Sequence, residues 1–202
     1  MPILKVCRLG HPVLRQLARR VSPDALAESA TQTLIDNMIE TMIEYRGVGL
    51  AAPQVYQSLS IAVIESHGPR GDIPLTVLAN PDVKAWGDRP VAERPPQAVY
   101  RSDMDGGPGA KEVLDEELVE DWEGCLSIPN LRGRVPRHAK LRVDALDRQG
   151  KRLQFVAEGF FARVVQHEFD HLMGRVYLDR MRDFSTLSHL DEFQRFWMPQ
   201  SS

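Results

Sequence analysis

The chain has 202 residues, of which 43% are hydrophobic and 26% are charged, and its formal net charge is −3. This length suits one domain with its own core, so we expect residues 1–202 to form a single domain. Its two cysteines, Cys7 and Cys125, are too few for a disulfide framework or a four-cysteine zinc site.

Composition also argues against several classes of partner. The mild acidity disfavours a nucleic-acid binder, which usually carries a basic face. No run approaches the roughly 20 apolar residues that span a bilayer. The first residues lack the pattern of a signal peptide or a transit peptide. We therefore expect a cytoplasmic protein with no membrane association and no direct nucleic-acid binding.

Helical periodicity appears early in the chain and again late. Ser22 and Pro23 form a typical helix start, with a serine cap and a proline in the first turn. Apolar residues then recur every three or four positions until Gly47, which predicts one amphipathic helix. The periodic positions are Leu26, Ala30, Leu34, Met38, Met42 and Tyr45. A second helix is predicted from near Gly159 to about Gly174.

Short apolar runs between these helices predict strands. Ser60–Ile64 and Leu75–Leu78 are bounded by turn-forming residues. Residues 141–145 and 153–156 alternate on either side of Asp147–Gly150, which is typical of a β-hairpin. Strands followed by a late helix, without repeated strand–helix alternation, favour an α+β fold.

The segment from about Gly87 to Asp121 differs from the rest because it is rich in proline, glycine and acidic residues. We interpret it as a surface insertion, with a short acidic helix over Val113–Val119. A solvated loop without chemistry and a lid near the site are both open interpretations.

The strongest chemical signal is His167-Glu168-Phe169-Asp170-His171. On a helix, residues four apart share a face, so both imidazoles can reach one metal ion. Glu168 follows the first histidine and can act as general base on a water at that ion. The pattern therefore predicts a metal site.

A catalytic metal site needs a third protein ligand and one open position. One metalloprotease pattern continues with a glycine and a further histidine; Gly174 fits it, but Tyr177 occupies the ligand position. A second protease pattern uses a downstream glutamate, for which Glu192 is the candidate. The third candidate is Cys125, which follows a glycine in EGCLS. The residues alone leave these alternatives open.

Three separated segments resemble, in order, the three signature motifs of peptide deformylases. They are GVGLAAPQ at 47–54, EGCLS at 123–127 and QHEFDH at 166–171. The similarity extends from about Gly10 to about Met181 and is broken by the insertion. The resemblance implies a metal-dependent hydrolase that removes the formyl group from the N-terminal formyl-methionine of newly synthesised polypeptides and releases formate.

The same resemblance implies a fold and a metal site. The fold is α+β, with antiparallel and mixed β-sheets around a central helix, residues 157–174, that carries HExxH. Cys125, His167 and His171 bind one divalent metal ion. A thiolate with two imidazoles suits Fe²⁺, Zn²⁺ or Co²⁺. The family typically uses Fe²⁺, and Zn²⁺, Ni²⁺ and Co²⁺ are the alternatives.

The implied catalytic residues are Glu168, Gln54 and Leu126. Glu168 takes a proton from water and delivers it to the departing amine, so one carboxylate serves as base and acid. By similarity to the family, the side-chain amide of Gln54 and the backbone N–H of Leu126 stabilise the oxyanion.

The implied peptide-binding segment is Gly47, Val48 and Gly49. Glycines there permit close approach of a peptide, which the family binds as an added β-strand. This mode gives affinity without sequence specificity.

Five further residues are expected around the substrate or at its rim. Phe160 and Val164 lie on the helix face that precedes His167 and are candidates for an apolar methionine pocket, with core packing as the alternative. Arg163 lies between them, at the pocket rim or on the surface. Arg132 matches a family arginine that contacts the peptide backbone, and Glu123 of EGCLS is assigned to substrate binding.

The expected partners are formyl-methionyl nascent peptides, with transient ribosome association. Some family members dock on the ribosome through a long basic C-terminal helix. Here Leu187, Leu190, Phe193 and Trp197 recur at helical spacing, but acidic residues outnumber basic ones from residue 182 onward. We therefore expect no tight docking on ribosomal RNA through this segment.

Two other functions remain as alternatives. A zinc endopeptidase would use His167, His171 and Glu192 as ligands, with Glu168 as base. A metal-binding or interaction module without activity is the other. Cys125 separates the first from a deformylase, and formate release separates the second.

Overall fold

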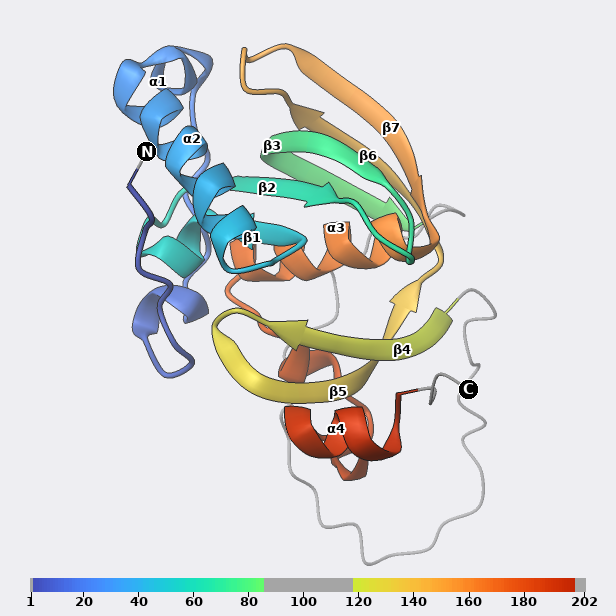
Figure 1. Ribbon diagram of the computed structural model, residues 1–202. Coiled ribbons are helices and arrows are strands. Elements are labelled where there is room, and N and C mark those ends of the chain that lie inside the picture. Colours follow the sequence, from blue (N-terminus) through green and yellow to red (C-terminus); the bar gives the residue numbers. More distant parts are fainter. Residues whose placement is uncertain (1, 86–117, 199–202) are drawn as a thin grey trace, which may run out of the picture.

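Two antiparallel sheets enclose one helix in the computed structural model, which describes residues 2–85 and 118–198 (Figure 1). The five-stranded sheet contains, in spatial order, β1 (Gly49–Ala51), β2 (Ile61–Ser66), β3 (Ile73–Ala85), β6 (Lys140–Leu146) and β7 (Arg152–Glu158). The three-stranded sheet contains β4 (Leu118–Cys125), β5 (Ile128–His138) and β8 (Ser188–His189). A parallel pairing occurs in the isolated bridge between Arg19 and Leu59.

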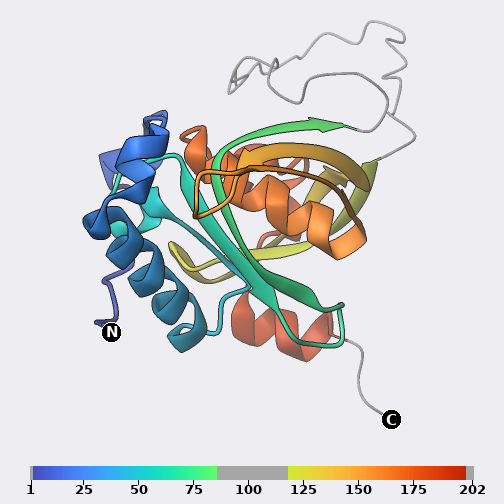
Figure 2. The ribbon, with the colours of Figure 1, turned by 90° about the horizontal axis from the view of Figure 1, so that it is seen from above.

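The helix between the sheets is α3 (Gly159–Leu172) (Figures 1 and 2). Gly159 adopts φ +57°, which turns the chain from β7 into the helix, and Gly174 adopts φ +70° just after its end. Val165 of α3 packs with Leu141 and Val143 in the core under the five-stranded sheet. The predicted second helix and the α+β class are confirmed.

The predicted N-terminal helix is two helices rather than one. Ser22 caps α1 (Pro23–Ala27) by accepting a hydrogen bond from the backbone N–H of Ala25 at 3.1 Å. Glu28 is extended, and α2 (Ser29–Glu44) begins after it. The Gln32 side-chain amide donates to the carbonyl of Leu26. In a continuous helix this carbonyl would instead accept a backbone N–H from the next turn. Helix α2 packs on β1 and β2.

The strand predictions agree with the observed elements. Residues 60–64 fall mainly in β2, and residues 75–78 lie inside β3. The predicted hairpin is β6–β7, whose turn closes through a hydrogen bond from the Gly150 N–H to the Asp147 carbonyl.

The predicted insertion lies mostly outside the described residues, since these omit 86–117. Where the structure describes it, the prediction was wrong: Leu118 and Val119 belong to β4 and pair with His138 and Arg137, rather than forming the end of an acidic helix. Asp121, the last residue of the predicted insertion, also belongs to β4.

In the part of the chain that the structure describes, the remaining elements of this kind are four short 3₁₀ helices and a C-terminal α-helix. They are η1 (Pro12–Arg15), η2 (Ala52–Val55), η3 (Tyr177–Arg180), η4 (Phe184–Thr186) and α4 (Leu190–Phe196). The helical prediction for the C-terminal segment is confirmed from Leu190 onward, and Phe193 of α4 packs against Trp122 with ring centroids 4.8 Å apart. Among the described helices, none has the length and apolar character needed to cross a membrane.

Candidate metal centre and active site

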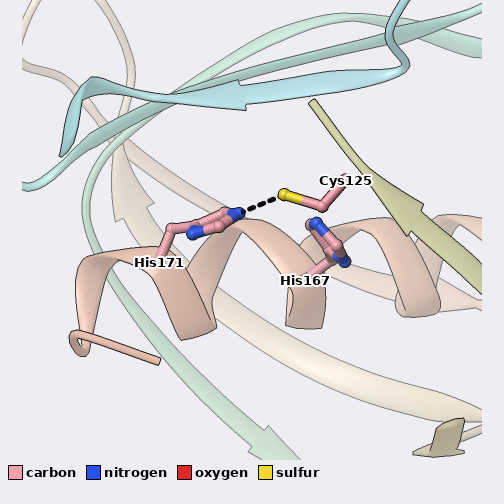
Figure 3. Close-up of side chains that lie close together, drawn as sticks. All are labelled: Cys125, His167 and His171. Carbon is pink, nitrogen blue, oxygen red and sulfur yellow. Dashed lines mark hydrogen bonds between the residues drawn. The ribbon is translucent and has the colours of Figure 1, made fainter. Parts of the chain in front are cut away.

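Helix α3 presents both predicted histidines to the end of β4. His167 and His171 lie one turn apart, with ring centroids 5.1 Å from each other. The Sγ of Cys125, the last residue of β4, lies 3.2 Å from His171 Nε2 (Figure 3). One donor atom from each of these three residues falls within 4.8 Å of the others. This is the ligand set expected for one metal ion.

The other two candidate ligands lie elsewhere. Glu192 is exposed on α4, away from the cluster of three donors. Tyr177 is buried, and its ring stacks against that of His167 with centroids 6.2 Å apart. Tyr177 therefore packs behind a ligand, whereas Cys125 completes the set.

Charges in the centre favour a thiolate. Burial opposes ionisation of Cys125, but the neighbouring His171 and a hydrogen bond from His167 hold the pKa of the thiol well below its usual value. Hydrogen bonds to Cys125 and Glu123 outweigh burial and raise the pKa of His167 well above its usual value. The thiolate of Cys125 and the imidazolium of His167 thus stabilise each other. A bound cation would take the place of the protons on these two side chains.

Glu168 is the buried carboxylate beside this centre. Its side chain is 3% exposed, and its Oε2 has no hydrogen-bond partner among the described residues. Burial raises its pKa to about 7. A Cβ on Gly49 of β1 would overlap the Glu168 carboxylate, so any larger residue here would force that carboxylate to move. An unpaired carboxylate oxygen is free to exchange protons with a water molecule near the Cys125, His167 and His171 side chains.

Gln54 of η2 points its amide nitrogen towards Cys125. Its Oε1 accepts from the Ala51 N–H at 2.8 Å, which fixes the orientation of the amide. Its Nε2 lies 3.6 Å from Cys125 Sγ and 3.3 Å from Ser127 Oγ. Leu126 follows Cys125 directly in the two-residue turn between β4 and β5. Both predicted oxyanion donors thus lie beside the metal centre.

Glu123 has different partners from those that we expected. Its Oε2 accepts from His167 Nδ1 at 2.9 Å, and its two oxygens pair with Arg137 Nε and Nη2 at 2.9 and 3.0 Å. Arg163 Nη1 also donates to Oε1. Although burial opposes ionisation, Arg137 and His167 hold the pKa of Glu123 below its usual value. Its carboxylate orients a candidate ligand instead of facing the substrate.

Arg137 and Asp170 extend this network, and neither was predicted from the sequence. Arg137 Nη1 donates to Asp170 Oδ2 at 2.6 Å, and Arg180 pairs with the other side of the same carboxylate. The side chains of Arg137 and Asp170 are 4% and 2% exposed. A charged residue inside the apolar face of α3, next to His171, was the available signal for Asp170.

The predicted peptide-binding segment lies at the free edge of the five-stranded sheet. Strand β1 pairs with β2, and no other described strand pairs with it. Val48 is 38% exposed and accepts a hydrogen bond from the Glu65 N–H. A Cβ on Gly47 would lie 3.0 Å from the Leu126 side chain. An unpaired edge beside the metal centre is what strand addition requires.

Arg132 of β5 lies over Gly124 of the neighbouring strand β4. A Cβ on Gly124 would overlap the Arg132 guanidinium, whose Nη1 donates to the Leu131 carbonyl at 2.9 Å. Glycine at position 124 therefore allows Arg132 to lie flat on β4. The Arg132 guanidinium thus lies over the residue that directly precedes Cys125.

Of the two predicted pocket residues, Phe160 lines cavities and Val164 does not fit that role. Phe160 borders a groove of about 410 Å³ that also touches Met42, Gly47, Val48 and Arg70. Arg70 lies over the Phe160 ring at 4.3 Å and pairs with Asp121. Val164 is 4% exposed and packs in the core with the five-stranded sheet. For Val164 the core alternative holds.

Arg163 is buried rather than on the surface, and it lines a cavity of about 180 Å³ together with Phe160 and Arg70. It is 6% exposed, and its guanidinium donates to the Val135 and Val119 carbonyls at 2.8 and 2.6 Å as well as to Glu123. The buried carboxylate and two strand carbonyls compensate for burial of this arginine.

Known proteins match this arrangement over most of the chain. The family model described as polypeptide deformylase matches residues 3–186. The chain belongs to the polypeptide deformylase family. Among its relatives, "Peptide deformylase 1" of Nitrosomonas europaea is 37% identical over 194 residues, covering 94% of this chain and 93% of the relative. "Peptide deformylase 1" of Bordetella pertussis is 35% identical over 191 residues, covering 92% of each chain.

Solved deformylases share the fold. The Met-Ala-Ser-bound class I type b peptide deformylase of Acinetobacter baumannii is 32% identical, with a TM-score of 0.71, and the match covers 89% of this chain and 99% of that one. The Thermotoga maritima peptide deformylase is 29% identical, with a TM-score of 0.69, covering 91% and 100%. All three deformylase motifs lie inside the matched region, whereas α4 follows it.

Proposed function

We propose that this deformylase removes the formyl group from the N-terminal formyl-methionine of newly synthesised polypeptides and releases formate. The observation that carries the proposal is the convergence of Cys125, His167 and His171 beside a buried Glu168 with an unpaired oxygen. Family membership supplies the substrate class. The endopeptidase alternative loses its third ligand, because Glu192 lies outside the cluster.

Cys125, His167 and His171 would hold one divalent cation, and we propose Fe²⁺. One thiolate and two imidazoles form a three-ligand set that leaves a position open for water. Such a cation supplies Lewis acidity, which makes water nucleophilic near neutral pH. Glu123 donates no ligand atom but holds His167 Nδ1, which fixes Nε2 as the atom that faces the site.

The proton steps fall to Glu168. As the carboxylate it takes a proton from the attacking water, and as the acid it returns that proton to the departing amine. Its pKa of about 7 suits both directions at neutral pH, because neither form is strongly favoured.

The developing oxyanion would receive two hydrogen bonds. Gln54 Nε2 already points towards Cys125, and Leu126 N–H belongs to the peptide that joins Cys125 to the turn. Because Ala51 holds Gln54 Oε1, the donor end of the amide is fixed before substrate arrives.

The peptide would lie along β1 as an added strand, between Gly47–Gly49 and Arg132. Main-chain hydrogen bonds give affinity without reading the sequence beyond the first residue. Phe160 and the apolar part of the adjoining groove, with Met42, would face apolar substrate side chains.

We further propose that nascent chains are met in the cytoplasm by transient encounter. Helix α4 carries Asp191 and Glu192 against Arg195, so it provides no basic surface for ribosomal RNA.

The direct test uses protein loaded with Fe²⁺ without air and a formyl-Met tripeptide. We expect stoichiometric formate and free tripeptide, with no cleavage of the peptide bonds. Glu168→Ala, which keeps all three ligands, is the control. Formate release no faster than in that control would contradict the proposal.

A further inference from the structure

The N-terminal segment Cys7–Leu9 connects the two elements that carry the proposed oxyanion donors. The Cys7 N–H donates to the Gln54 carbonyl at 2.8 Å. Two residues later, the Leu9 N–H donates to the Ser127 carbonyl at 2.9 Å. One segment is thus bonded to η2 on one side and to the β4–β5 turn on the other.

Arg8 adds a charged hydrogen bond to the same turn. Its Nη1 donates to the Leu126 carbonyl at 2.6 Å. A bond of this kind is shorter and stronger than one between neutral groups. Because the turn has two residues, Arg8 and Leu9 together hold both of its carbonyls. These bonds restrain the peptide groups that follow Leu126 and Ser127, next to the peptide group that carries the Leu126 N–H.

The segment is anchored on the other side by Cys7. This side chain is fully buried, and its thiol donates to the Pro53 carbonyl at 3.4 Å. Gln54 Nε2 also reaches across the gap directly, at 3.3 Å to Ser127 Oγ and 3.6 Å to Cys125 Sγ. The shorter bonds between η2 and the turn run through residues 7–9.

We propose that Arg8 is a positioning residue, which fixes the Leu126 N–H relative to the Gln54 amide through its bond to the Leu126 carbonyl. This inference rests on the proposed function, because it assigns Arg8 a role through the two oxyanion donors. Donors of this type act only when they are held in place before the reaction, and small displacements reduce their effect. Arg8 contacts neither a metal ligand side chain nor the peptide groove in the described contacts.

The test compares Arg8→Met, Arg8→Lys and Arg15→Met with the wild type on a formyl-Met tripeptide. Arg15 is the matched control, since it is an exposed arginine of the same region that pairs with Asp179 on the surface. For Arg8→Met we expect kcat per bound metal to fall about 5- to 30-fold, with KM within about twofold. Arg8→Lys should recover most of kcat, and Arg15→Met should match the wild type.

Hydrogen exchange provides a readout that does not depend on activity. Amides of residues 124–128 should exchange faster in Arg8→Met than in the wild type or Arg15→Met, while the melting temperatures remain similar. Unchanged kcat and unchanged exchange in Arg8→Met would overturn the inference and leave the proposed function intact. A loss explained entirely by lower metal content or by unfolding would also overturn it. A wild-type protein that releases no formate contradicts both.

Discussion

The carboxylate of Glu168 occupies the space in which a Cβ of residue 49 would lie, and Gly49 leaves that space free. Glu168 comes from α3 and Gly49 from the edge strand β1. This contact joins the proposed proton-transfer group to the strand beside which the peptide would bind.

Gly49→Ala should therefore displace Glu168 without touching a metal ligand. We expect metal content to stay near that of the wild type and kcat to fall at least about 100-fold, because a positioned acid–base group contributes that much. Gly68→Ala is the control, since a Cβ there meets no atom within 4 Å. Because Gly68 lines the same groove as Phe160, the comparison uses kcat and not KM, and kcat should be unchanged. Equal kcat values for the two variants would contradict the role of this contact.

Glu123→Gln tests the hydrogen bond to His167 Nδ1. The amide keeps the shape of the side chain but loses the charge that orients the imidazole. We expect metal affinity to fall about 10- to 100-fold in a chelator competition. Asp144→Asn is the comparison, because this carboxylate pairs with Arg152 on the surface. An affinity loss of the same size in both variants would argue against specific orientation of His167.

Arg137→Met tests the buried charge network. Its removal leaves the carboxylates of Glu123 and Asp170 without their shared partner. We expect the free energy of unfolding of the metal-free protein to fall by about 3–5 kcal/mol, measured with urea. Arg148→Met, which breaks a partly exposed pair with Asp36, should cost about 1 kcal/mol or less. Similar losses would show that the network contributes no more than a surface pair.

The same carboxylates predict a pH dependence of stability. Burial opposes their ionisation, but Arg137 keeps the pKa values of Glu123 and Asp170 below those of the unfolded chain. Their stabilising contribution is therefore present above the unfolded pKa, near 4, and is lost as pH falls below it. Metal-free wild type should lose stability between about pH 5 and 3 more steeply than Glu123→Gln. Parallel curves would be the contrary result.

Local spacing explains how much of the site could be predicted. His167, Glu168 and His171 form one helical motif, and the turn chemistry around Asp147–Gly150 specifies its hairpin. The position of Cys125 beside them required the family resemblance, because Cys125 lies 42 positions before His167 and no periodicity links them.

The buried charges were harder to predict, because their burial depends on partners in other strands. An arginine in a helix is expected at the surface, but Arg163 is buried. Glu123 and two strand carbonyls compensate for its burial. Arg137 lies in β5 among alternating residues and carries no motif of its own. The break at Glu28 was missed for a related reason, since the side chain of Gln32 replaces the helical hydrogen bond there.

The most direct test of the whole account is metal content measured together with formate release in Cys125→Ala and Glu192→Ala, purified without air. We predict that Cys125→Ala loses both metal and activity, whereas Glu192→Ala keeps one metal ion per chain and wild-type formate release. Retained metal and activity in Cys125→Ala, with loss of both in Glu192→Ala, would contradict the assigned ligand set and the deformylase mechanism built on it.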